Sequence, residues 1–146
     1  MKTMIRTLIF IGFFVGVTYD TFGQDQLDAE IVSDLQAAKQ YAFGVSQELH
    51  FRGVLGMYDR LVDSGVGVTD YEIVVKGKVV KQLVKGSELE TLFKKYKGKV
   101  RVSVCSVAMG KLGVTEDQLI DGMNPVATYS IRLLQLQANG YNTLTY

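Results

Sequence analysis

Strand-like and helix-like segments alternate along this sequence, and that alternation restricts the fold more than any other feature. Segments rich in valine, isoleucine or tyrosine, which suit β-strands, occupy residues 41–45, 71–75, 100–105 and 141–146, with 123–126 as a connection or brief strand. Segments with apolar residues at helical spacing lie between them, at 47–62, 79–84, 87–97, 106–112 and 128–138. Such alternation predicts an α/β fold, in which a mostly parallel sheet carries helices on both faces.

The helical segments also predict which side chains face the core and how the helices begin. Ser46 is the expected N-cap of the helix over 47–62, and Ser87–Glu90 and Thr115–Gln118 fit the pattern of capping boxes. The residues expected on apolar helix faces are Leu27, Ile31, Leu35 and Ala38 in the first helix, Phe51, Val54, Leu55, Tyr58, Leu61 and Val62 in the second, and Ile131, Leu134 and Ala138, with Leu133 and Leu136 beside them, in the last.

Composition excludes several classes of function. The chain has 146 residues, of which 47% are hydrophobic, so it is expected to form one domain with a substantial core. A formal net charge of +1 gives no support for nucleic-acid binding. One cysteine and one histidine, Cys105 and His50, exclude an internal disulfide, a multi-thiolate zinc site and a histidine cluster. No glycine-rich phosphate loop is present, and we expect neither a metal nor a cofactor.

The first 23 residues have the pattern of a signal peptide. Lys2 and Arg6 precede an apolar run at residues 8–17, and the small residues Thr21 and Gly23 permit cleavage before Gln24. The run is shorter than a membrane span requires, although an uncleaved anchor remains the alternative. We therefore predict an exported, periplasmic protein with no membrane attachment after cleavage. Residues 24–39 would form a helical extension and residues 40–146 the main domain.

Cys105 is the strongest candidate for a reactive residue. It ends a valine-rich strand, and the residues after it change to helical spacing until Gly113. A thiol at the start of a helix lies near the positive end of the helix dipole, which favours the thiolate, the nucleophilic form. The alternative is equally physical, because free cysteines often pack in cores as small hydrophobic residues.

Ligands of a parallel sheet usually bind beyond the carboxyl ends of its strands, and this places other candidates near Cys105. Lys76 and Lys78 flank Gly77 after the second strand and could present ammonium groups to an anion, although solvent exposure explains them as well. Ser106 and Met109 follow Cys105 and complete the candidate ligand contacts, with core packing as the simpler interpretation of Met109. The loop at residues 46–47 reaches the same edge, whereas His50 is expected on the surface.

Three stretches resemble the DsrE/DsrF-like sulfur-relay (YchN-like) family. Residues 104–114 resemble its cysteine motif, in which a strand ends in the cysteine, an alanine follows three residues later and a Gly-Val pair closes the turn. Residues 71–81 look like its second strand and loop, and residues 134–145 look like its last helix, Gly-Tyr turn and last strand. The three stretches occur in the family's order and together span most of residues 41–146.

This resemblance implies a three-layer αβα sandwich with a five-stranded, mostly parallel sheet, commonly assembled as a trimer or hexamer. It also implies that Cys105 carries sulfur as a persulfide and exchanges it with donor or acceptor proteins. The leading hypothesis is thus an exported sulfur carrier, a sulfurtransferase-like relay. The alternative is a non-catalytic oligomeric module of the same fold that binds a small ligand or a protein.

Overall fold

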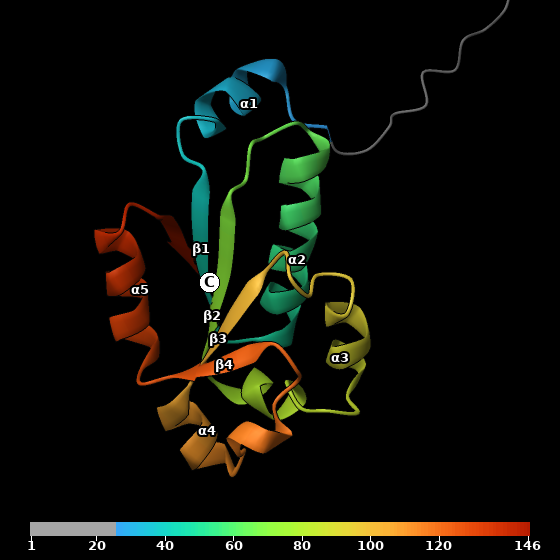
Figure 1. Ribbon diagram of the computed structural model, residues 1–146, viewed down its shortest axis with the longest axis vertical. Helices are drawn as coiled ribbons and strands as arrows, with labels where there is room; N and C mark the ends of the chain where they lie inside the picture. Colours follow the sequence, from blue (N-terminus) through green and yellow to red (C-terminus); the bar gives the residue numbers. More distant parts are fainter. Residues whose placement is uncertain (1–25) are drawn as a thin grey trace, which may run out of the picture.

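The computed structural model describes residues 26–146, so the predicted signal peptide and its cleavage site lie outside the described residues. Five parallel strands form one sheet in the order β4-β3-β2-β1-β5 (Figure 1). The strands are β1 (Gln40–Val45), β2 (Asp70–Val75), β3 (Arg101–Cys105), β4 (Met123–Val126) and β5 (Asn142–Thr145). The predicted α/β class and parallel sheet are confirmed, and the brief segment at 123–126 is a strand.

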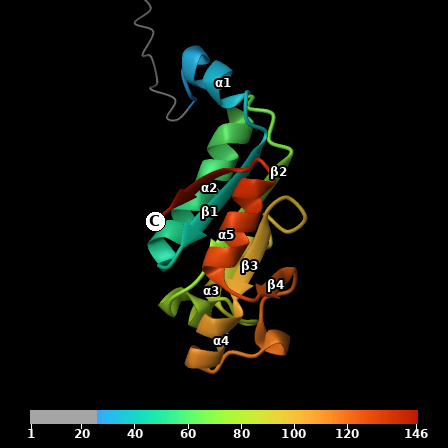
Figure 2. The ribbon, with the colours of Figure 1, turned by 90° about the vertical axis from the view of Figure 1, so that its left-hand side faces the viewer.

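Helices cover both faces of this sheet, as predicted. On one face lie α2 (Glu48–Asp63) and α3 (Glu88–Phe93), and on the other lies α5 (Tyr129–Ala138), which Figure 2 shows across the front of the strands. The carboxyl ends of the strands are followed by the 3-10 helix η1 (Lys78–Gln82), by α4 (Ser106–Leu112) and by the 3-10 helix η2 (Glu116–Gln118). The extension forms α1 (Ala29–Leu35) at the opposite end of the molecule (Figure 1).

The hydrophobic core has two parts, because neighbouring strand residues point to opposite faces. The larger part lies on the α2 side and includes Tyr71, Ile73 and Val75 of β2 together with Phe51 and Phe93. The smaller part lies beneath α5. Its buried residues are Ala42, Val74, Cys105, Tyr129, Leu133 and Leu136.

The sequence pattern predicted the wrong inner face for α5. Tyr129, Leu133 and Leu136 are buried against the sheet, whereas Ile131 and Leu134 are 53% and 60% exposed. The helix is apolar on two sides, so hydrophobic spacing alone does not decide between them.

Ion pairs beneath α5 fix its orientation. The Glu72 carboxylate on β2 is fully buried and accepts hydrogen bonds from Arg132 Nε and Nη2 of α5 at 2.7 and 2.8 Å. Ser103 Oγ donates to the same carboxylate at 2.6 Å, and Arg101 Nη2 of β3 lies 2.8 Å from it. Burial alone would raise the pKa of Glu72, but these hydrogen bonds and the two arginine charges hold it below its ordinary value.

The same network continues to the amino end of the sheet. Arg101 donates to Asp70 through Nε at 3.0 Å and Nη2 at 2.7 Å, a bidentate pair, and the Tyr141 hydroxyl also donates to Asp70. Although burial opposes it, hydrogen bonds from Tyr141 and Arg101 lower the pKa of Asp70. Every charge of this group therefore has an opposite partner, as buried ions require.

Three smaller expectations about helix ends and faces are corrected. Gln47, not Ser46, is the N-cap of α2, and its side chain makes no capping hydrogen bond. Val62 is 44% exposed. In α1, Val32 packs against the core and Ile31 is 43% exposed, whereas Leu27, Leu35 and Ala38 pack against the core as predicted.

The two capping boxes differ. Thr115 and Gln118 form the complete reciprocal pair. At the other site Ser87 Oγ accepts from Glu90 N–H, but the Glu90 carboxylate accepts from Gly86 N–H instead of Ser87 N–H.

Candidate functional site

Cys105 is the last residue of β3 and the N-cap of α4, so the predicted handover from strand to helix at the thiol is confirmed. It follows Arg101 and Ser103 on the sheet face toward α5, since alternate residues of β3 share a face. The residue is 6% exposed and belongs to the cluster of Tyr129 and Val74 beneath α5. The thiol is therefore buried at the carboxyl end of β3.

A groove opens beside this thiol. Its volume is about 320 Å³, and it lies between the loop after β2 and one side of α4. The lining residues are Lys76, Gly77, Lys78, Cys105, Val107, Ala108, Lys111 and Leu112. The sequence predictions Lys76, Gly77 and Lys78 are thus brought together with Cys105 in one place. We call this the Cys105 groove.

The charges of the Cys105 groove are of one sign. Lys76, Lys78 and Lys111 line it, and no aspartate or glutamate does. None of the three ammonium groups forms an ion pair with a carboxylate among residues 26–146. An anion in the groove would therefore meet positive charge that no protein group neutralises.

Lys76 is held at the side of the groove by Tyr129. Its Nζ lies 4.1 Å from the centre of the Tyr129 ring, a cation–π contact. The ring in turn covers Gly44 of β1, where a Cβ atom would lie 2.1 Å from the tyrosine hydroxyl oxygen. Burial raises the pKa of the Tyr129 hydroxyl. Gly44 thus leaves the space that the Tyr129 side chain occupies.

The loop after β2 is fixed by Gly77. Its φ of 75° is in the left-handed region, and a Cβ atom would lie 2.8 Å from the Ser46 carbonyl oxygen. Ser46 and Gln47 share a second, open groove of about 450 Å³ with Lys78, but Cys105 does not line it. The loop after β1 therefore supports the site without reaching the thiol.

Two of the predicted ligand contacts lie outside the Cys105 groove. Ser106 is exposed at the first turn of α4 but is absent from the groove lining. Met109 is 5% exposed and packs in the larger core on the α2 side. Met109 is therefore a packing residue, as the simpler interpretation of the sequence held.

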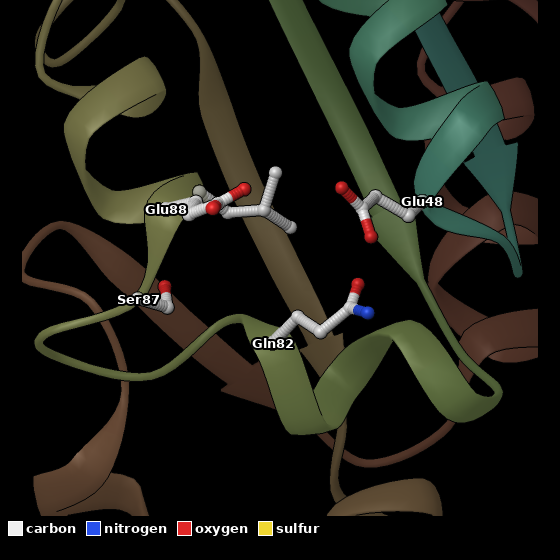
Figure 3. A pocket seen from close by; sticks show the side chains of 5 residues that line it. Glu48, Gln82, Ser87 and Glu88 are labelled. Atoms are coloured by element: carbon white, nitrogen blue, oxygen red, sulfur yellow. The ribbon is translucent and has the colours of Figure 1, made fainter.

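A separate pocket of about 190 Å³ lies between α2 and α3. Figure 3 shows the carboxylates of Glu48 and Glu88 facing each other across it, with the Gln82 amide below. Arg52 lies 2.7 Å from Glu48 and 3.7 Å from Glu88, so one cation already pairs with these two carboxylates. No group of three or more potential metal ligands occurs within residues 26–146.

The model of the DsrE/DsrF-like family matches residues 53–146, which is more than half of the sequence. The chain belongs to the DsrE/DsrF-like family. No curated protein matches the sequence. In the part of the chain that the structure describes, no helix is long and apolar enough to cross a membrane.

Two solved structures share the DsrE/DsrF-like fold of this chain. A protein of unknown function, MTH1491 from Methanobacterium thermoautotrophicum, is similar with a TM-score of 0.61 and 19% identity over 73% of this chain and 98% of that one. The YchN protein from E. coli is similar with a TM-score of 0.57 and 18% identity over 73% of this chain and 99% of that one. These structures support the αβα architecture, and at such low identity they carry no residue roles.

Sequence reasoning missed half of the groove lining. Val107, Ala108, Lys111 and Leu112 all come from α4, where the second, third, sixth and seventh residues share a side of the helix. The sequence does contain a pattern that indicates this lining. The pair Val107-Ala108 is followed four residues later by Lys111-Leu112, and this helical spacing places an apolar strip and one lysine on the same side of α4. The sequence pattern also gave no indication of the cation–π contact between Tyr129 and Lys76.

Proposed function

We propose that this protein is a sulfur carrier that holds a persulfide on Cys105. One observation carries the proposal: the thiol ends strand β3 and borders a groove whose three lysines have no carboxylate partner among residues 26–146. Membership of the DsrE/DsrF-like family, which is linked to sulfur relay, supports the same chemistry. Persulfides are more acidic than thiols, and an anionic Cys-S-S⁻ would be stabilised by neighbouring ammonium groups.

The carriage step is an exchange between two sulfur atoms. The Cys105 thiolate attacks the outer sulfur of a persulfide R-S-SH and forms a new S–S bond to Cys105. The old S–S bond breaks, its electron pair leaves on R-S⁻, and no external oxidant or reductant is consumed. Delivery is the reverse reaction, in which an acceptor thiolate attacks the outer sulfur of Cys105.

Export and self-association form part of the same proposal. The signal-peptide pattern of residues 1–23 supports a periplasmic location. A homo-oligomer is supported by the outer side of α5, where Ile131 and Leu134 are more than half exposed. Donor and acceptor proteins would then meet the Cys105 groove of each subunit.

The proposal is tested by intact-mass spectrometry. The purified protein is incubated with a small persulfide donor and weighed before and after addition of a thiol reductant. We expect a gain of about 32 Da, one sulfur atom, which the reductant removes. Cys105→Ser should show no gain, and because the residue is small and borders the groove its unfolding free energy should change by less than about 1 kcal/mol. A wild-type protein that stays unmodified, or a gain that persists in Cys105→Ser, would contradict sulfur carriage.

A binding module without sulfur chemistry is the second candidate, favoured by the 6% exposure of Cys105. In that case Cys105→Ser would leave both stability and ligand affinity unchanged and the wild type would gain no sulfur. The same mass measurement therefore separates the two candidates.

A further inference from the structure

The lining of the Cys105 groove indicates a definite class of ligand. Its walls are mostly apolar, with Cys105, Val107, Ala108 and Leu112 along one side. Val107 is 49% exposed, so part of an aliphatic side chain faces solvent at the groove. Small-molecule sites typically combine apolar walls with a few oriented polar groups and begin at about 300 Å³, which the groove volume of about 320 Å³ satisfies.

The polar groups of the groove are all cations. Lys76 and Lys78 line one side of the groove and belong to the segment after β2. Lys111 lines the other side and lies one turn after Val107 on α4. Elsewhere in the described chain, two lysines have an acidic partner within ion-pair distance. Lys95 pairs with Asp59 at 2.6 Å and Lys85 with Asp121 at 3.3 Å. The groove thus combines apolar contact area with three lysines that pair with no carboxylate among residues 26–146.

We infer that the Cys105 groove binds a small amphipathic organic anion, with its apolar body against α4 and its acidic group toward the three lysines. A fully hydrophilic anion would leave Val107 and Leu112 without a contact, and a neutral apolar molecule would leave the lysine charges unused. If Cys105 carries sulfur as proposed above, its small-molecule partner is then an organic persulfide or thiol that bears a carboxylate or sulfonate, rather than an inorganic sulfur anion.

The binding half of this inference is tested without sulfur chemistry. Protein from the full chain, with Cys105→Ser, is labelled with ¹⁵N and titrated with naphthalene-2-sulfonate while the amide signals of Gly77, Val107 and Lys111 are followed. We expect saturable shifts of these signals. Sodium sulfate, which has only the charge, and 2-naphthol, which has only the apolar body, should each bind at least about tenfold more weakly.

Charge variants provide the matched control. Lys78→Glu with Lys111→Glu should weaken naphthalene-2-sulfonate binding by about tenfold. Lys94→Glu with Lys97→Glu makes the same change in net charge at exposed positions outside the groove and should leave the affinity unchanged. Equal affinities in the two double variants, or equal binding of sulfate and naphthalene-2-sulfonate, would overturn the assignment.

The sulfur half uses wild-type protein and two donors, the persulfide of 6-mercaptohexanoate and inorganic thiosulfate. We expect the organic donor to load Cys105 at least about tenfold faster, and naphthalene-2-sulfonate to slow that loading by competition. Loading at equal rates, or without competition, would overturn the ligand assignment and leave sulfur carriage standing. Binding of naphthalene-2-sulfonate with no loading from either donor would overturn sulfur carriage and leave the ligand class standing.

Discussion

The charged side chains at the two ends of the sheet beneath α5 are arranged in opposite ways. At the amino end, Asp70 and Glu72 meet Arg101 and Arg132 at hydrogen-bonding distance, and each charge has an opposite partner. At the carboxyl end, a thiol lies beside three lysines, and no carboxylate shares their groove. Both groups lie along the same strands, β2 and β3, only a few residues apart.

This difference separates the two roles: the paired charges at the amino end stabilise the fold, and the lysines at the carboxyl end are suited to bind a ligand. Paired charges under a helix determine how that helix sits, since removing one partner leaves a buried ion without compensation. Unpaired lysines around a groove contribute little to stability and attract anions from solution. Substitutions at the two ends should therefore have opposite profiles, with stability lost at the first and ligand affinity lost at the second.

The largest effect is expected from Arg132→Met. The substitution keeps much of the side-chain length but removes two of the hydrogen bonds to the buried Glu72 carboxylate. We expect a loss of about 3 kcal/mol in unfolding free energy, measured by urea denaturation.

Lys111→Met is the matched control at the other end, because it removes a cation that has no carboxylate partner among the described residues. Its unfolding free energy should change by no more than about 0.5 kcal/mol. Similar losses of unfolding free energy in Arg132→Met and Lys111→Met would show that the two ends of the sheet do not differ in their contribution to stability.

A smaller but clear loss is expected from Gly77→Ala, which tests whether the groove wall is rigid. The residue has a φ of 75°, and the new Cβ would lie 2.8 Å from the Ser46 carbonyl oxygen. We expect a loss of about 2 kcal/mol together with weaker naphthalene-2-sulfonate binding. Gly53→Ala in α2 has no atom within 4 Å of the new Cβ and should be neutral or stabilising. A neutral Gly77→Ala would show that the loop adapts freely.

The third effect is graded and depends on pH. The pKa values of Asp70 and Glu72 lie below their ordinary values of 3.8 and 4.5, so both carboxylates stabilise the fold fully above those values. As pH falls through the lower values of the folded state, this contribution is lost. We expect the urea midpoint to fall between about pH 5 and about pH 3, and to fall less in Arg132→Met. Equal slopes in the two proteins would assign the acid sensitivity to other carboxylates.

Much of the architecture could be predicted because it depends on local pattern. The valine-rich segments 71–75 and 100–105 became β2 and β3, and the parallel order followed from the helices between them. The thiol of Cys105 was placed correctly for the same reason, since a change from strand to helix periodicity marks the residue at the junction. The lysines of the β2 loop also followed, because the carboxyl ends of parallel strands meet at one edge.

The parts that could not be predicted depend on contacts between distant residues. Ile131 and Leu134 match a helical stripe as well as Leu133 and Leu136 do, and the choice between them rests on Glu72, sixty residues away from Arg132. Met109 and Lys111 are neighbours on α4, yet one packs in the core and the other lines the groove.

The sequence by itself determined the α/β class, the parallel sheet and the position of the single thiol, because periodicity and chain order are local properties. The tertiary structure decided which side of α5 is buried and which lysines surround Cys105. It also decided that the charges at one end are paired and those at the other are not. The physical reason is that pairing and burial depend on distances across the sheet, which no local pattern encodes.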